Sequence, residues 1–219
     1  MTGGLRIALP GGALLDRACA SLRAAGIAQL ESAAFERLLL VHSGDHTFIK
    51  IRPTDVPVYV EMGACDAGIV GKDVLWESDR VCYELVDLRF GGCHLALAAP
   101  LGSAIARGEW MPGMRVATKY PISAARFFES IGMAAELIKL HGSIELAPAT
   151  GLADAVLDIV DTGNTLRANG LVEVMTADHS TARLIVNHAS LKTRSLEVNA
   201  AAAALRRAAA RDISTEGVA

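Results

Sequence analysis

Residues 158–170, DIVDTGNTLRANG, gather acidic, hydroxyl and amide side chains around a glycine. Asp158 and Asp161 offer carboxylates, and Gly163 lets the backbone approach a ligand closely. Backbone N–H groups at a helix start bind anions, above all phosphate. Carboxylates would repel that phosphate, but they accept hydrogen bonds from sugar hydroxyls or hold them through a divalent cation. The loop therefore predicts a site for a ribose 5-phosphate.

A purely structural interpretation of the same loop stays open. Asp and Thr are common in strand-to-helix turns, and Thr162 stands where it can cap a helix that begins near Thr165. A short motif of this kind does not choose between the two interpretations.

The surrounding pattern predicts strands that alternate with helices. Short apolar runs rich in branched residues indicate strands, and apolar residues at helical spacing indicate helices. The expected strands are 5–10, 37–44, 46–52, 66–71, 83–90, 93–100, 115–120, 135–140, 153–160, 171–177 and 181–190. The expected helices are 13–26, 55–64, 121–132 and 195–212.

This alternation predicts an α/β fold with mostly parallel sheets covered on both faces. The economical architecture has two lobes, one of residues 1–88 with 178–219 and one of 89–177, and the chain crosses between them more than once. We expect the ligand in the cleft, at the carboxyl ends of strands. Strands 83–90 and 93–100 either pair as antiparallel neighbours or pass from one lobe to the other. Helix 195–212 is expected to cover a surface rather than extend the core.

Composition narrows the function classes. The 219 residues are 52 % hydrophobic, which is enough for a substantial core. A net charge of −3 and 5 % aromatic residues argue against a nucleic-acid partner. No apolar run approaches the roughly 18 residues of a membrane span, and the first residues do not resemble an export signal. Four cysteines without a C-x-x-C pair are typical of reduced, buried thiols, so we expect a cytoplasmic protein without a membrane partner.

Longer stretches of the chain resemble the ATP phosphoribosyltransferase family. ELAPATGLADAVLDIVDTGNTLRANGL, residues 145–171, is similar to the signature of that family, and residues 55–77, 115–128 and 182–192 also resemble it. The matching signature positions are Glu145, Gly151, Asp158, Thr162, Gly163, Thr165 and Leu166. The length of the chain resembles the short form of the family, which lacks a C-terminal regulatory domain.

The resemblance implies a glycosyltransferase that opens histidine biosynthesis. N1 of the adenine of ATP attacks the anomeric carbon of 5-phosphoribosyl-1-pyrophosphate (PRPP) and releases pyrophosphate, with Mg²⁺ as cofactor. It also implies a histidyl-tRNA-synthetase-like regulatory subunit and a homodimer or larger hetero-oligomer. Such a reaction requires two aligned substrates and cations near the departing pyrophosphate.

The same resemblance implies roles for individual residues, while the groups that contact the metal stay unknown. The implied PRPP-binding residues are Asp158, Asp161, Thr162, Gly163, Asn164, Thr165 and Leu166. The implied ATP-binding residues are Gly11, Gly12, Arg52, Asp66, Lys72 and Tyr120, and the implied catalytic residues are Arg37 and Asp161.

Each implied role has a structural alternative. Arg37 and Arg52 would serve equally as surface salt-bridge partners. Asp66 and Lys72 also suit turns, and Tyr120 would either stack on adenine or close the core.

Two further groups of residues favour a structural interpretation. His42 and His46 are four apart, but the glycine between them argues against a helical zinc pair. Cys65 suits a small side chain that fills the core better than it suits a nucleophile, because nothing near it in the sequence would lower its pKa.

One stretch departs from the family pattern. Members usually carry Lys-Gly-Arg after the first strand, where this chain has Gly11, Gly12 and Ala13. Loss of a charge-assisted contact to a leaving group costs on the order of 10²–10³ in rate. Restoring Gly11→Lys with Ala13→Arg should therefore raise turnover, unless another cation such as Arg17, Lys72, Arg37 or a neighbouring subunit's arginine already acts there.

Three functions therefore remain open at this point. The first is an active short-form transferase, and the second is a catalytically weakened paralogue that binds ATP and PRPP. The third is a bilobal solute receptor, because the architecture resembles the periplasmic binding protein fold. The absence of an export signal argues against the receptor.

Overall fold

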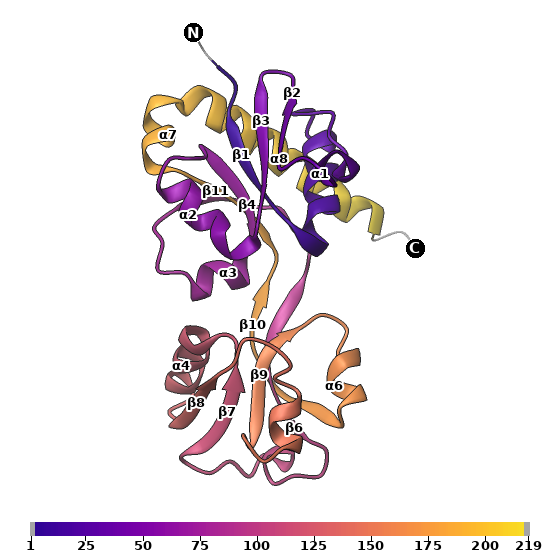
Figure 1. Ribbon diagram of the computed structural model, residues 1–219, viewed down its shortest axis with the longest axis vertical. Helices are drawn as coiled ribbons and strands as arrows, with labels where there is room; N and C mark the ends of the chain where they lie inside the picture. The colour runs from indigo at the N-terminus through magenta and orange to yellow at the C-terminus, as the bar shows by residue number, and fades with distance from the viewer. Residues whose placement is uncertain (1–2, 217–219) are drawn as a thin grey trace. The chain divides into compact units, whose positions relative to one another are not determined.

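The computed structural model describes residues 3–216, which divide into two compact units (Figure 1). Unit 1 takes the described residues up to Gly91 and from Thr181 onward, and unit 2 is Gly92–Ser180. Each unit is built on one β-sheet with helices packed against it. None of the described helices combines the length and the apolar character that a bilayer span requires.

The sheet of unit 1 has the order β2-β3-β1-β4-β11-β5 over the described residues. Strand β1 pairs in parallel with β3 and β4, and the other neighbours are antiparallel. The strands are β1 (Arg6–Pro10), β2 (Leu40–Ser43), β3 (His46–Ile51), β4 (Ala67–Gly71), β5 (Tyr83–Asp87) and β11 (Ala182–Val186). The helices of unit 1 are η1 (Gly12–Leu14), α1 (Leu15–Ala24), η2 (Ser32–Phe35), η3 (Pro53–Asp55), α2 (Val56–Glu61), α3 (Lys72–Glu77), α7 (His188–Thr193) and α8 (Ser195–Glu216).

The sheet of unit 2 has the order β10-β6-β9-β7-β8 over the described residues, and β7 pairs in parallel with β8 and β9. Its strands are β6 (Cys93–Pro100), β7 (Met114–Thr118), β8 (Ala135–Lys139), β9 (Ala155–Val160) and β10 (Leu171–Ser180). Its helices are η4 (Ile105–Arg107), α4 (Pro121–Ser130), α5 (Leu146–Ala149) and α6 (Asn164–Ala168).

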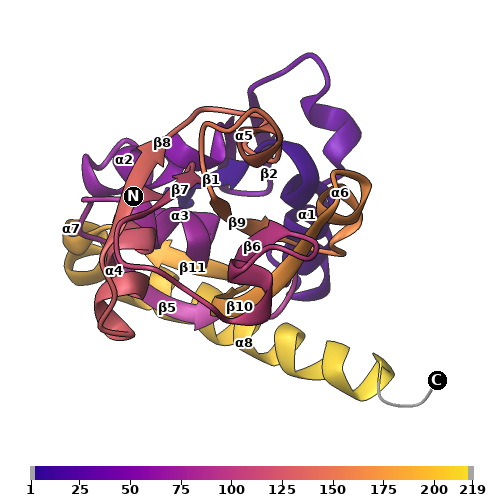
Figure 2. The same cartoon turned by 90° about the horizontal axis from the view of Figure 1, so that it is seen from below.

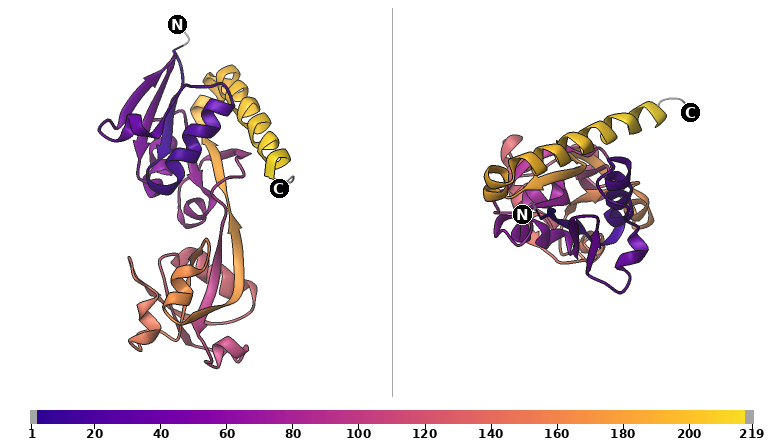
Figure 3. Two further views of the ribbon diagram at one scale, coloured as in Figure 1. Left: turned by 90° about the vertical axis from the view of Figure 1, so that its right-hand side faces the viewer. Right: turned by 90° about the horizontal axis from the view of Figure 1, so that it is seen from above.

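The core of unit 1 follows from the alternation of side chains along β1. Ile7 and Leu9 join a buried cluster with residues of α1 and α8, whereas Ala8 joins a second cluster with residues of α2. Because successive side chains of a strand point to opposite faces, both faces of this sheet are buried. Figure 3 shows α8 lying along one face of unit 1, and Figure 2 shows it beside β5 and β11.

The predicted α/β class is confirmed, but the expected mostly parallel sheets are wrong. Four neighbouring strand pairs are parallel and five are antiparallel over the described residues. One reason is local, because β2 and β3 form a hairpin whose short turn permits only antiparallel pairing. The other reason is that the chain enters unit 2 on β6 and leaves it on β10, so these paired strands run in opposite directions. Strands β5 and β6 belong to different units and do not pair.

Two expectations for the C-terminal part are also wrong. Residues 187–190 do not end a strand, because the Asn187 side chain accepts the N–H groups of Ala189 and Ser190 and so begins α7. Helix α8 does extend the core, since it buries Val198 and Leu205 against the sheet of unit 1.

Candidate functional site

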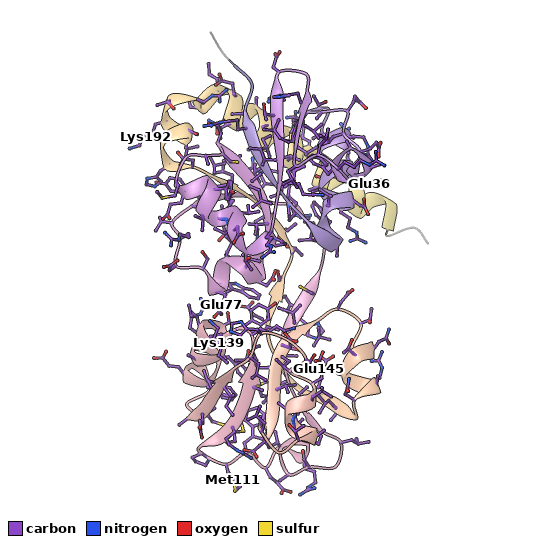
Figure 4. All side chains as sticks on the ribbon, viewed as in Figure 1. Glu36, Glu77, Met111, Lys139, Glu145 and Lys192 are labelled. Atoms are coloured by element: carbon purple, nitrogen blue, oxygen red, sulfur yellow. The ribbon has the colours of Figure 1, made fainter. Side chains whose placement is uncertain are left out.

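The DIVDTGNTLRANG loop lies at the carboxyl end of β9 in unit 2. It encloses a cavity of about 290 Å³ together with Glu145, which Figure 4 labels. All seven residues predicted to bind PRPP line this cavity: Asp158, Asp161, Thr162, Gly163, Asn164, Thr165 and Leu166. In residues 3–216, the N–H groups of 162–166 donate to no protein acceptor, so they are available to an anion.

Gly163 fixes the local shape of the loop. It adopts φ 71° and ψ 5°, a left-handed conformation that only glycine adopts readily, and it is the N-cap of α6. The expected capping of this helix by Thr162 is therefore wrong. The carbonyl oxygen of Thr162 instead accepts a hydrogen bond from Arg167 Nη2 at 2.8 Å.

Arg167 holds the loop by hydrogen bonds and Glu173 lies beside Gly163, and sequence reasoning missed both. Arg167 Nη2 also donates to Asn164 Oδ1 at 2.6 Å, so one guanidinium group spans the residues on either side of Gly163. Glu173 Oε2 lies 2.7 Å from His94 Nε2. Arg167 lies within the signature-like stretch, directly after Leu166, whereas Glu173 and His94 belong to β10 and β6 and are brought together by the pairing of those strands.

Of the two loop aspartates, Asp158 and Asp161, Asp158 is the more buried. Its side chain is 13 % exposed and lies 3.8 Å from Lys119 Nζ. Burial raises the pKa of Asp158 above its usual value, and the positive charge of Lys119 opposes that shift. Lys119 follows β7, whose carboxyl end lies beside that of β9 because the two strands are parallel. It was not predicted, although its position directly before Tyr120 is a usable signal.

The residues predicted to bind ATP do not share one location. Tyr120 belongs to unit 2, where it is the N-cap of α4 at the carboxyl end of β7. Gly11, Gly12 and Arg52 line a cavity of about 880 Å³ in unit 1, at the carboxyl ends of β1 and β3. Lys72 follows β4 at the same edge of that sheet and forms an ion pair with Glu84.

Asp66 lies at the other end of the same sheet. It precedes β4, and the parallel pairing of β1 with β4 places it beside Arg6, whose N–H it accepts at 2.8 Å. Its carboxylate also accepts Ser190 Oγ at 2.8 Å and Arg194 Nη1 at 2.9 Å, and the residue is 5 % exposed. This network fastens α7 and the start of α8 to the sheet.

We expect Asp66→Asn to destabilise unit 1 without weakening ATP binding. Breaking one partner of a buried ion pair costs about 3–5 kcal/mol, and an amide keeps part of the hydrogen bonding, so a loss of about 2–4 kcal/mol is expected. Urea denaturation measures this loss, with Glu109→Gln as the control because its pair with Arg107 is exposed. Unchanged stability together with a raised KM for ATP would assign Asp66 to the nucleotide site after all.

The remaining candidates line neither cavity. Arg37 is exposed between η2 and β2. His42 Nδ1 lies 3.0 Å from Thr47 Oγ1, and His46 Nδ1 accepts the N–H of Leu5 at 3.0 Å. Within the described residues, no three His, Cys, Asp or Glu side chains cluster as metal ligands.

The four cysteines form no disulfide, and two of them, Cys82 and Cys93, are only half-buried rather than buried. Burial raises the pKa of the Cys65 thiol to about 11. The thiolate is the reactive form, so this environment suits a filler and not a nucleophile.

Comparison with known proteins identifies the family of the chain. The family model described as HisG, ATP phosphoribosyltransferase, matches residues 52–207. An ATP phosphoribosyltransferase of Deinococcus deserti is 50 % identical over 190 residues, covering 87 % of this chain and 86 % of that protein. One of Thermoanaerobacter sp. strain X514 is 46 % identical over 196 residues, covering 89 % of this chain and 91 % of that protein.

Solved structures agree with this assignment. A chain of the ATP phosphoribosyl transferase (HisG:HisZ) complex from Thermotoga maritima is 32 % identical with a TM-score of 0.77, covering 94 % of this chain and 99 % of that chain. The periplasmic aliphatic sulphonate binding protein SsuA from Escherichia coli is 13 % identical with a TM-score of 0.63, covering 99 % of this chain and 76 % of that chain. This second likeness shows the fold alone, and it confirms the expected periplasmic-binding-protein-like architecture. From its sequence and its fold together, the chain belongs to the ATP phosphoribosyltransferase family.

Proposed function

We propose that the chain condenses ATP with PRPP to give phosphoribosyl-ATP and pyrophosphate, the first step of histidine biosynthesis. A bond forms between N1 of adenine and the anomeric carbon of PRPP while the bond from that carbon to the pyrophosphate oxygen breaks. The observation that carries the proposal is the single cavity around residues 158–166, in a chain that is 46–50 % identical to ATP phosphoribosyltransferases over most of its length.

In this proposal the loop binds two parts of PRPP with two kinds of group. The 5-phosphate accepts hydrogen bonds from the N–H groups of 162–166, which have no protein acceptor among the described residues. The ribose hydroxyls donate to the carboxylates of Asp158 and Asp161. The positive charge of Lys119 opposes the rise in the pKa of Asp158 that burial causes. Tyr120 follows β7, the parallel neighbour of β9, and in this proposal its ring would stack on the adenine of ATP.

Members of this family are metal-dependent, and we propose that Mg²⁺ is the ion. The donor set around the loop cavity fits it, because Glu145, Asp158 and Asp161 offer the carboxylate oxygens that Mg²⁺ prefers. When bound, Mg²⁺ would neutralise charge on the pyrophosphate.

We further propose that the chain acts in the cytoplasm with a regulatory subunit. The solved relative from Thermotoga maritima is a HisG:HisZ complex, which supports a partner of the HisZ type, resembling histidyl-tRNA synthetase. The assembly would then be a hetero-oligomer built on a homodimer or a larger core. Four cysteines without a disulfide suit a reducing compartment.

The direct test is formation of phosphoribosyl-ATP from ATP and PRPP, with and without Mg²⁺ and with and without the regulatory subunit. We expect Mg²⁺-dependent product. The Gly11–Gly12–Ala13 turn favours a second candidate, a weakened paralogue that binds both substrates without turnover. Retained PRPP binding with no product under any condition would support the paralogue and exclude the enzyme.

Asp161→Asn should raise the KM for PRPP by roughly 10- to 100-fold, because a charged acceptor of a hydrogen bond contributes about 1.5–3 kcal/mol. The KM for ATP should change far less. Asp154→Asn is the matched control in the same unit, since Asp154 pairs with Arg115 and does not line the loop cavity. Equal KM values for PRPP in the wild type and Asp161→Asn would leave the loop with a structural role only.

A further inference from the structure

The turn that follows β1 has almost no side chains of its own. Gly11, Gly12 and Ala13 line the 880 Å³ cavity of unit 1 at the carboxyl end of β1. Gly11 N donates to Ile51 O at 2.8 Å, which fastens the turn to the end of β3. The parallel register pairs Leu9 with Lys50, so Lys50 lies on β3, next to the end of β1 where the turn begins.

Lys50 occupies the space beside Gly11. A Cβ atom built on Gly11 would lie 3.9 Å from Lys50 Cγ, and both residues line the same cavity. Lys50 is half-buried, and its Nζ donates to the carbonyl oxygen of Phe35, which orients the ammonium group. An ammonium group carries further N–H donors beyond the one that this carbonyl uses.

The charge of this cavity is positive on balance. Its cationic lining residues are Lys50 and Arg52, and its acidic one is Asp55. Among the side chains that the structure describes, neither Lys50 nor Arg52 forms an ion pair with a carboxylate. A half-buried cation without a counter-ion is costly unless an anion pairs with it, so the cavity is suited to a multiply charged anion.

We infer that Lys50 binds the phosphate oxygens of a substrate and supplies the positive charge that the Gly11–Gly12–Ala13 turn lacks. This inference rests on the proposed function, and its ligand is a pyrophosphate or triphosphate group, brought by PRPP or by ATP. It also changes the outcome expected for restored basic residues. A lysine at position 11 would stand against Lys50 and repel it, so Gly11→Lys in the wild-type chain brings no gain in turnover.

The test removes the charge of Lys50 while keeping its aliphatic length, in Lys50→Met. Loss of one charge-assisted hydrogen bond should raise the Kd of the phosphate ligand by about 10- to 100-fold. Titration calorimetry with ATP and with PRPP separately assigns the effect to one substrate. Lys192→Met is the control, because Lys192 is an exposed lysine of α7 in the same unit, which Figure 4 labels.

Rescue provides the decisive arm of the experiment. The double variant Lys50→Met with Gly11→Lys should recover most of the lost affinity, since Gly11 has φ −68° and its nearest neighbour to a new Cβ lies 3.5 Å away. Lys50→Arg should keep wild-type affinity and guards against a folding defect of the methionine variant. A wild-type chain that forms phosphoribosyl-ATP, with Lys50→Met binding both substrates normally, would overturn the inference and leave the proposed function intact. A wild-type chain that binds neither ATP nor PRPP would instead overturn the proposed function.

Discussion

Arg167→Gln is expected to weaken PRPP binding by about 10- to 100-fold, because each hydrogen bond from a charged donor contributes about 1.5–3 kcal/mol. Its guanidinium group donates to Thr162 O at 2.8 Å and to Asn164 Oδ1 at 2.6 Å. These two bonds hold the residues that flank Gly163, so the N–H groups of the loop keep the arrangement that a phosphate requires. Arg167 acts through the loop and is a positioning residue.

The measurement for Arg167→Gln separates positioning from general stability. We expect the KM for PRPP to rise with a smaller change in the KM for ATP, and Arg167→Lys to rescue only part of the loss, because a lysine lacks the planar fork of arginine. Arg107→Gln is the matched control, since Arg107 is an exposed arginine of unit 2 that pairs with Glu109. A lowered melting temperature with an unchanged KM for PRPP would reduce Arg167 to a structural residue.

Gly163→Ala is expected to damage the same site through the backbone. A left-handed conformation costs a residue with a Cβ atom roughly 1–2 kcal/mol. At Gly163 that atom would also lie 2.9 Å from Arg167 Nη1 and 3.3 Å from Glu173 Oε1, so the guanidinium group whose Nη2 bonds the loop must shift. We therefore expect PRPP affinity to fall on the order of 10- to 100-fold, as for loss of Arg167 itself.

Gly170→Ala provides the control that isolates the collision from the strain. Gly170 has φ 69°, close to the 71° of Gly163, but nothing lies within 4 Å of a Cβ built on it. Both variants should lose similar free energy of unfolding in urea, and only Gly163→Ala should raise the KM for PRPP. Equal KM shifts in the two variants would attribute the effect to backbone strain alone.

Local features of this protein followed from local sequence. The strand, loop and helix around residues 155–168 were predictable because apolar periodicity and a glycine act within a few residues of each other. The family resemblance was confirmed by the family model, and six of its seven matching signature positions line one cavity; Gly151 does not. The expected cap at Thr162 was wrong because the left-handed conformation of Gly163 moved the start of α6 by one residue.

Strand direction and register were decided by the tertiary structure. Asp66 and Gly11 both adjoin strands of one sheet, yet the parallel pairing of β1 with β4 places them at opposite ends. The antiparallel pairs arise where the chain makes a hairpin or passes between units. The hydrophobic periodicity of a strand does not show the direction in which that strand pairs.

The family, the α/β class and the loop at residues 158–166 could all be predicted from the amino-acid sequence alone. The sequence also exposed the absence of basic side chains at Gly11 and Ala13. Only the tertiary structure placed Lys50 beside that turn and Arg167 behind the loop's backbone. The physical reason is that a side chain's partner across a sheet depends on hydrogen-bonded register, which is set by the packing of residues far apart in the chain.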